Sequence, residues 1–134
     1  MIYLDSNIFI YAALNMKPAA DNCIKIMNEI ANKKINACTS VLTWDEFFQA
    51  IKKNLGSDYA SLESERLLKF LNLTFLNADM KVIALAQKLA AKYNLGPRDA
   101  IHAATAIVHE CKEIISDDAD FDKIKELKRI KVKQ

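Results

Sequence analysis

The first twelve residues constrain the fold more than any other stretch of the chain. An apolar run at residues 2–4 ends at Asp5, two small polar residues follow, and a second apolar run begins at Ile8. This pattern is typical of a short buried strand that passes directly into a helix. Taken alone, Asp5 indicates a helix N-cap, which contributes about 1 kcal/mol. It also stands at the carboxyl end of a strand, where open α/β sheets bind their ligands.

The rest of the chain alternates between strand-like and helix-like segments. Apolar residues at helical spacing predict helices over residues 6–14, 18–32, 40–55, 57–71, 80–93 and 97–108, with a short one at 121–125. Short β-compatible runs predict strands at 2–4, 35–39, 73–76, 113–115 and 129–132. Such alternation predicts an α/β domain with a central, mainly parallel sheet of four or five strands. The consecutive helices at 40–55 and 57–71 are expected to form a cleft wall or a subunit interface.

Composition limits the possible partners and compartments. A chain of 134 residues, 51% hydrophobic, is expected to fold as one domain spanning residues 1–134. The formal net charge of +2 argues against binding nucleic acid through bulk charge, so any RNA contact must be local. The sequence has no apolar run long enough for a membrane span and no basic leader, so a cytoplasmic protein is expected. Cys23, Cys38 and Cys111 form no metal-binding pattern and are expected to be reduced and packed.

Three further acids share the local context of Asp5. Asp99 lies in the first turn of a predicted helix, and Asp118 and Asp120 follow the predicted strand at 113–115. Each has an ordinary structural explanation, because Asp99 can favour the helix dipole, Asp118 can cap a short helix and Asp120 can be solvated. In a parallel sheet, however, all four positions lie along one edge.

Four acids on one edge indicate a cation. Two carboxylates about 4 Å apart repel by about 4 kcal/mol at an effective dielectric near 20. Gathering several is therefore unfavourable unless a cation lies among them. Oxygen ligands without a His/Cys cluster suit Mg²⁺ or Mn²⁺, the ions that serve phosphodiester hydrolysis.

The helix predicted at residues 40–55 carries two adjacent acids, Asp45 and Glu46. On a helical wheel its apolar residues form one face, which Asp45 borders and which Glu46 opposes. Periodicity therefore predicts that Glu46 is exposed.

Four stretches of the sequence have the pattern of one known family: Ile2-Tyr3-Leu4-Asp5-Ser6-Asn7, Ser40-Val41-Leu42-Thr43-Trp44-Asp45-Glu46-Phe47, Arg98-Asp99-Ala100-Ile101-His102-Ala103-Ala104-Thr105-Ala106 and Ile114-Ile115-Ser116-Asp117-Asp118-Ala119-Asp120-Phe121. Through them the sequence resembles the PIN-domain ribonucleases over nearly its whole length, and most closely the VapC toxins of toxin–antitoxin pairs. The third and fourth stretches are the more specific. Ser116 stands where the family commonly has Thr, and the hydroxyl is kept.

The resemblance implies a three-layer α/β/α sandwich that cleaves single-stranded RNA with Mg²⁺ or Mn²⁺. A metal-bound water would attack in line and leave a 5′-phosphate and a 3′-hydroxyl. The family register assigns the catalytic metal ligands to Asp5, Glu46, Asp99 and Asp118, with Asp120 as a supporting ligand. It places Ser6, Asn7 and Ser116 where they would hydrogen-bond the acids or their waters.

The same resemblance implies two protein partners. VapC-like proteins form homodimers and are silenced by an antitoxin whose C-terminal segment fills the cleft. Trp44, Phe47 and Phe48 exceed what one core needs, which favours a dimer surface.

Two other functions remain open. One is a PIN-type nuclease that processes cellular RNA without an antitoxin. The other is a binding module with an acidic edge that does not cut RNA. Within that second class a phospho-receiver is disfavoured, because the late strand ends without the Lys that a receiver needs.

Several residues near the motifs have simpler explanations. His102 is expected to be packed or solvated, although one turn beyond Asp99 it can also face the site. Arg98 can contact a substrate phosphate or lie exposed. Tyr3 is expected in the core, and the basic residues of the C-terminal tail are expected on a solvated edge strand.

Overall fold

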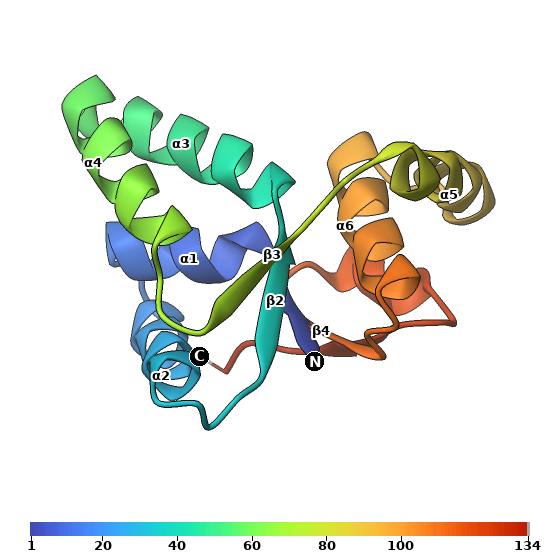
Figure 1. Ribbon diagram of the computed structural model, residues 1–134, viewed down its shortest axis with the longest axis horizontal. Coiled ribbons are helices and arrows are strands. Elements are labelled where there is room, and N and C mark those ends of the chain that lie inside the picture. Colours follow the sequence, from blue (N-terminus) through green and yellow to red (C-terminus); the bar gives the residue numbers. More distant parts are fainter. Residues whose placement is uncertain (134) are drawn as a thin grey trace.

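A parallel sheet forms the centre of the molecule in the computed structural model, which describes residues 1–133 (Figure 1). Tyr3 on the central strand pairs with Cys38 on one side and with Ile114 on the other. The strands lie in the order β3-β2-β1-β4-β5. Their bounds are β1 (Ile2–Leu4), β2 (Ala37–Ser40), β3 (Leu73–Leu76), β4 (Glu113–Ile115) and β5 (Lys128–Ile130), and all four pairings are parallel.

The helices begin and end at residues that the sequence marks for these positions. The Asp5 and Asp79 side chains cap α1 and α5 by accepting the N–H groups of Ser6 and Val82. Asn15 and Asn94 end these two helices in the left-handed conformation, with φ of 51° and 53°. The helices are α1 (Ser6–Leu14), α2 (Ala20–Ala31), α3 (Leu42–Leu55), α4 (Ser57–Leu68), α5 (Met80–Tyr93), α6 (Pro97–Val108) and the short 3₁₀ helix η1 (Ala119–Lys123).

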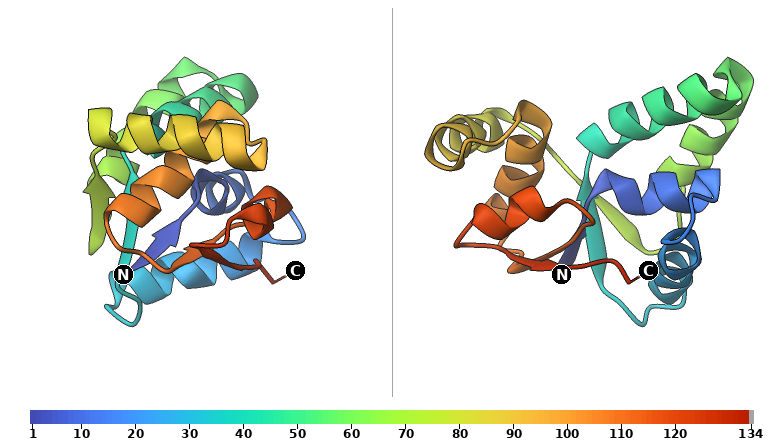
Figure 2. Two further views of the ribbon diagram at one scale, coloured as in Figure 1. Left: turned by 90° about the vertical axis from the view of Figure 1, so that its right-hand side faces the viewer. Right: turned by 180° about the vertical axis from the view of Figure 1, so that it is seen from behind.

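Helices cover both faces of the sheet, so the α/β/α sandwich predicted from the sequence is confirmed (Figures 1 and 2). Successive strand residues point to opposite faces. Tyr3 and Ile114 pack in one core cluster with residues of α5, α6 and η1. Leu4 and Ile115 pack in the other, with residues of α1 to α4. The near-continuous apolar character of β1 and β4 therefore reflects burial on both sides.

Helices α3 and α4 form a hairpin that extends beyond the sheet (Figure 1). They are joined at Gly56, whose φ of 90° favours glycine. The Ser40 hydroxyl accepts the N–H of Leu42, and α3 begins at that residue, two positions after the predicted start at residue 40.

Two further expectations concern the cysteines and membrane association. Cys23, Cys38 and Cys111 are buried and free, as the sequence predicts. Within residues 1–133, no helix combines the length and the apolar composition that crossing a membrane requires.

Candidate functional site

The strand order reverses between β1 and β4, and the site lies where these two strands end. In open α/β sheets this reversal creates a crevice at the carboxyl ends of the strands. Asp5 follows β1 and Ser116 follows β4. The Ser116 hydroxyl donates a hydrogen bond of 2.7 Å to Asp5 Oδ2 and thereby joins the two strand ends.

Asp5 is both a helix cap and a member of this site. Its Oδ1 accepts the Ser6 N–H at 2.8 Å, and the residue is 5% exposed. Burial raises the pKa of Asp5, while the nearby His102 and the hydrogen bond from Ser116 lower it. The net effect is a raised pKa, so the protein alone does not fully stabilise the ionised form of Asp5.

Asp99, Asp118 and Asp120 form an outer acidic cluster beside Asp5. One carboxylate oxygen from each lies within 4.8 Å of the others. Asp118 caps η1 by accepting the Asp120 N–H at 2.9 Å, and its own N–H donates to Ser116 Oγ at 2.9 Å. Asp99 comes from the first turn of α6. Two segments, the first turn of α6 and the start of η1, thus bring these three carboxylates together.

The outer cluster holds three carboxylates and, among residues 1–133, pairs with a single cationic side chain, Lys123, whose Nζ lies 3.3 Å from Asp120 Oδ1. Burial and the adjacent charge of Asp118 raise the pKa of Asp99 to about 7, and the charge of Asp5 adds to this. Asp99 therefore retains a proton up to about neutral pH when no cation is bound. Asp120 is the most accessible of the three, with a side chain 49% exposed.

Glu46 faces the site, so the prediction from helical periodicity that it is exposed was wrong. Its side chain is 19% exposed, and its carboxylate is hydrogen-bonded to Nε2 of His102. The helical wheel gave a wrong prediction because α3 contacts the rest of the protein on two sides. Its apolar residues, such as Ile51, pack in the core, whereas its first turns also border the carboxyl edge of the sheet.

A pair of buried threonines sets the orientation of α3. The Thr43 hydroxyl is 2.7 Å from that of Thr39, which in turn donates to the carbonyl of Leu4 at 2.8 Å. This connection holds the first turn of α3 against the end of β1. Glu46, one turn beyond Thr43, is thereby directed toward the site.

His102 is the site residue that the sequence reasoning undervalued. Its side chain is fully buried, which agrees with the expectation that the ring is packed. Both ring nitrogens nevertheless contact polar groups of the site. Nδ1 lies 2.6 Å from Tyr3 Oη, and Nε2 contacts Glu46 and lies 3.7 Å from Asp5 Oδ1. Burial lowers the pKa of His102, but the hydrogen bond to Glu46 and the charge of Asp5 outweigh burial and raise it. The available signal was its position three residues after Asp99 on one helix face.

The predicted supporting residues lie in different environments. Ser6 contributes its backbone N–H to Asp5, and Asn7 Nδ2 reaches Ser116 Oγ at 3.5 Å. Asn7 Oδ1 is buried and has no hydrogen-bond partner among residues 1–133. Arg98 is exposed and joins none of the ion pairs found in the described part of the chain.

These groups fit a hard divalent cation. The outer cluster supplies three carboxylates, and the unpartnered Asn7 Oδ1 is a further oxygen acceptor near the edge. Mg²⁺ and Mn²⁺ prefer such oxygen ligands and bind through a few carboxylates together with water. Asp5 and Glu46 are not part of the three-carboxylate cluster and lie on its inner side, around His102.

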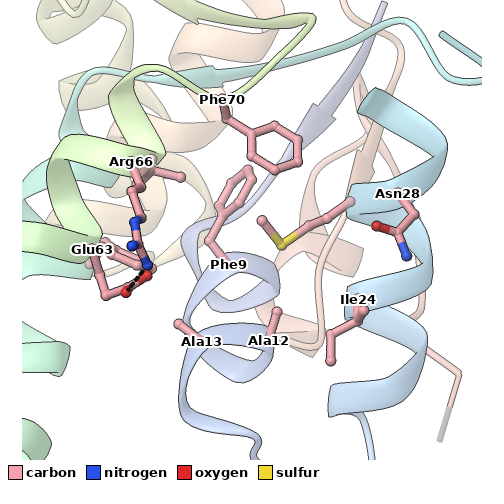
Figure 3. A pocket seen from close by; sticks show the side chains of 11 residues that line it. Phe9, Ala12, Ala13, Ile24, Asn28, Glu63, Arg66 and Phe70 are labelled. Atoms are coloured by element: carbon pink, nitrogen blue, oxygen red, sulfur yellow. Dashed lines mark hydrogen bonds and ion pairs between the residues drawn. The ribbon is translucent and has the colours of Figure 1, made fainter. Parts of the chain in front are cut away.

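A separate apolar groove lies between α1, α2 and α4. It has a volume of about 370 Å³. The rings of Phe9 and Phe70 face each other inside it, and an ion pair of 2.9 Å between Glu63 and Arg66 lies at its margin (Figure 3). Ala12 and Ala13 of α1 and Ile24 of α2 also line the groove. The groove combines an apolar floor with a charged margin.

Comparison with known proteins identifies a family and a shared fold. The family model described as PIN domain matches residues 2–127. A comparison with curated protein sequences finds no match.

Several solved toxin–antitoxin structures resemble the chain over nearly its full length. VapBC2 from Rickettsia felis, bound to a DNA fragment from its promoter, has 20% identity and a TM-score of 0.76, with 98% of each chain covered. VapC20 from Mycobacterium tuberculosis, a toxin that cleaves the sarcin-ricin loop, has 11% identity and a TM-score of 0.77, covering 91% of this chain and 93% of the other. VapBC-1 from nontypeable Haemophilus influenzae has 22% identity and a TM-score of 0.71, with 98% of each covered. At these identities the likeness establishes the fold alone.

Proposed function

The chain belongs to the PIN-domain family, and on this premise we propose that it is a metal-dependent endoribonuclease acting as the toxin of a toxin–antitoxin pair. The observation that carries the proposal is the cluster of Asp99, Asp118 and Asp120 at the carboxyl edge of the sheet. Its excess negative charge favours a bound cation. The exposed side of the cluster leaves room for a phosphodiester to approach.

The acids have distinct roles in this proposal. Asp99, Asp118 and Asp120 would hold Mg²⁺ or Mn²⁺, and Asp5 and Glu46 would contribute to binding it from the inner side. When bound, the cation would supply a water of lowered pKa and would neutralise charge on the phosphate, and the expected products are a 5′-phosphate and a 3′-hydroxyl. Ser116 fixes Asp5 and Asp118 together through its hydroxyl. Arg98, exposed beside Asp99, is available to a phosphate of single-stranded RNA.

An RNA cleavage assay tests the proposal. The purified chain is incubated with single-stranded RNA and Mn²⁺, and parallel samples contain excess EDTA or double-stranded RNA. Cleavage that requires Mn²⁺ and leaves 5′-phosphate ends supports the proposal. Cleavage unaffected by EDTA, or products with a 2′,3′-cyclic phosphate, would contradict it.

We propose that the groove between α1, α2 and α4 binds an amphipathic segment of the antitoxin. Its apolar floor and the Glu63–Arg66 pair suit a helix or strand with one apolar face and flanking charges. Two of the structurally similar proteins are VapBC complexes, which agrees with a protein partner for a chain of this fold.

The alternative to the toxin is a housekeeping nuclease without an antitoxin. The product of a small neighbouring gene that co-purifies with the chain would favour the toxin.

Substitution of Ala13 with Arg is expected to prevent this co-purification. Ala13 is exposed in the free chain, so a large charged side chain there blocks the groove without disturbing the core. Ala91→Arg, at an exposed position of α5 outside the groove, is the matched control. Pull-down of tagged variants with the co-expressed neighbour measures the effect. Equal recovery with Ala13→Arg and with Ala91→Arg would place the partner elsewhere.

We also propose that the chain forms a homodimer through the start of the α3–α4 hairpin. Val41 and Trp44 are 43% and 41% exposed, and the Trp44 ring packs on that of Phe48 with centroids 5.4 Å apart. Phe47, by contrast, is buried and lines the groove between α1, α2 and α4, so it does not belong to this surface. Light scattering on the purified chain decides between the masses of one and two subunits.

A further inference from the structure

A buried histidine connects the inner acids of the site to the central strand. His102 lies on α6, Tyr3 on β1 and Glu46 on α3, so one ring joins three elements. We propose that His102, held by Tyr3, is a positioning residue that fixes the Glu46 carboxylate toward the candidate cation site. This inference rests on the proposed function, because it assigns Glu46 to that site.

Both ring nitrogens of His102 have a polar partner. Nδ1 is 2.6 Å from the Tyr3 hydroxyl, and Nε2 is hydrogen-bonded to the Glu46 carboxylate. The Tyr3 and His102 rings meet edge to face, with centroids 5.7 Å apart and an angle of 67° between their planes. Both residues are fully buried. The ring therefore has one orientation, set by the hydroxyl on one side and by packing on the other.

The acids around Nε2 determine where the ring carries its hydrogen. Glu46 contacts this nitrogen and Asp5 Oδ1 lies 3.7 Å away, so a lone pair on Nε2 would face two carboxylates. A hydrogen on Nε2 turns the same contact into a donor–acceptor pair. The neutral ring then accepts the Tyr3 O–H at Nδ1. An imidazolium also donates from Nε2, so the bond to Glu46 is kept in either charge state.

This bond restricts a side chain that would otherwise move. Glu46 is 19% exposed, and among residues 1–133 its carboxylate has His102 as its only hydrogen-bond partner. Partners that orient metal-binding groups are commonly worth about 10-fold to 100-fold in metal affinity or activity. A core histidine without this role would be replaceable by an apolar side chain of similar volume with no effect on metal binding.

The test compares Tyr3→Phe with Tyr93→Phe. Each loses one hydroxyl, and the Tyr93 hydroxyl contacts only the Glu126 carboxylate and the Lys125 N–H, away from the site. Mn²⁺ affinity is measured by calorimetry, kcat and KM are measured on RNA, and the side-chain nitrogens of His102 are followed by ¹⁵N NMR. For Tyr3→Phe, Mn²⁺ binding is expected to weaken about 10-fold and kcat to fall about 10-fold to 100-fold, with little change in KM. Tyr93→Phe is expected to match the wild type.

A second pair of variants keeps the inference testable if Tyr3→Phe unfolds. His102→Gln retains an N–H donor for Glu46, whereas His102→Leu retains only the volume. We expect His102→Gln to recover part of the Mn²⁺ affinity that His102→Leu loses. Equal Mn²⁺ affinity in wild type and His102→Leu, or a wild-type ring without hydrogen on Nε2, would overturn the positioning role alone. A wild-type protein that binds no Mn²⁺ and cleaves no RNA would overturn the proposed function as well.

Discussion

Asp99→Asn is expected to slow Mn²⁺-dependent RNA cleavage by about 10²-fold to 10³-fold and, at the same time, to stabilise the metal-free protein at neutral pH. The variant removes one of the three clustered carboxylates, and with it a negative charge that would bind the cation. Loss of a preorganised electrostatic group costs about 10²-fold to 10³-fold in rate. In the metal-free protein the same substitution relieves the cost of burying a charge and the repulsion from Asp118, which together raise the pKa of Asp99 to about 7. Because the cluster is partly exposed and screened by water, the expected gain is about 1–2 kcal/mol.

The opposite signs of the two effects make this variant informative. Cleavage is measured on single-stranded RNA, and the free energy of unfolding is measured by urea denaturation at pH 7.5 in EDTA. Asp58→Asn is the matched control, because Asp58 is exposed in the first turn of α4. An Asp99→Asn protein that cleaves at the wild-type rate would remove Asp99 from the site. A variant that loses both activity and stability would indicate a structural role instead.

The metal-free protein is expected to lose stability as pH rises from about 4 to about 7. Asp99 has a folded-state pKa of about 7 against an ordinary value of 3.8, and the pKa of Asp5 is also raised. Over this range the folded state binds more protons than the unfolded state, so the free energy of unfolding falls with pH. The raised pKa of His102 acts in the same direction, since its stabilisation is lost as the ring deprotonates.

Divalent metal is expected to reverse this trend. Mn²⁺ competes with protons for the same carboxylates, so its stabilising effect should be small near pH 5 and large at pH 7.5. Urea denaturation at a series of pH values, with EDTA or with saturating Mn²⁺, measures the difference. An effect of Mn²⁺ that does not depend on pH would contradict binding at Asp99.

The strands and most helix ends could be predicted because local sequence determines them. Residues 2–4, 73–76 and 113–115 are strands with the predicted bounds. Each is a short, largely apolar run that ends at a polar residue. The parallel arrangement followed from the alternation of elements, and it placed Asp5 and Ser116 at one edge. The convergence of Asp99 with Asp118 then followed from the fold class together with the family resemblance.

Tertiary contacts explain what the sequence did not reveal. Glu46 lies opposite the apolar face of its own helix, and only the placement of α3 against the sheet edge directs it inward. His102 contacts Tyr3, 99 residues away, and Glu46, 56 residues away. The alanine-rich sequence around His102 does not indicate these distant partners. The division of the acids into an outer cluster and an inner group around His102 is likewise set by packing.

Calorimetric titration of the purified chain with Mn²⁺ tests the central claim most directly. The cluster of Asp99, Asp118 and Asp120 predicts saturable binding at pH 6.5, where Asp99 with its pKa of about 7 is still mostly protonated, release of protons as the cation displaces them, and loss of both signals in Asp99→Asn. The proton release appears as a dependence of the measured heat on the ionisation enthalpy of the buffer. No saturable Mn²⁺ binding at millimolar concentration, or unchanged binding in Asp99→Asn, would contradict a metal site at this edge of the sheet.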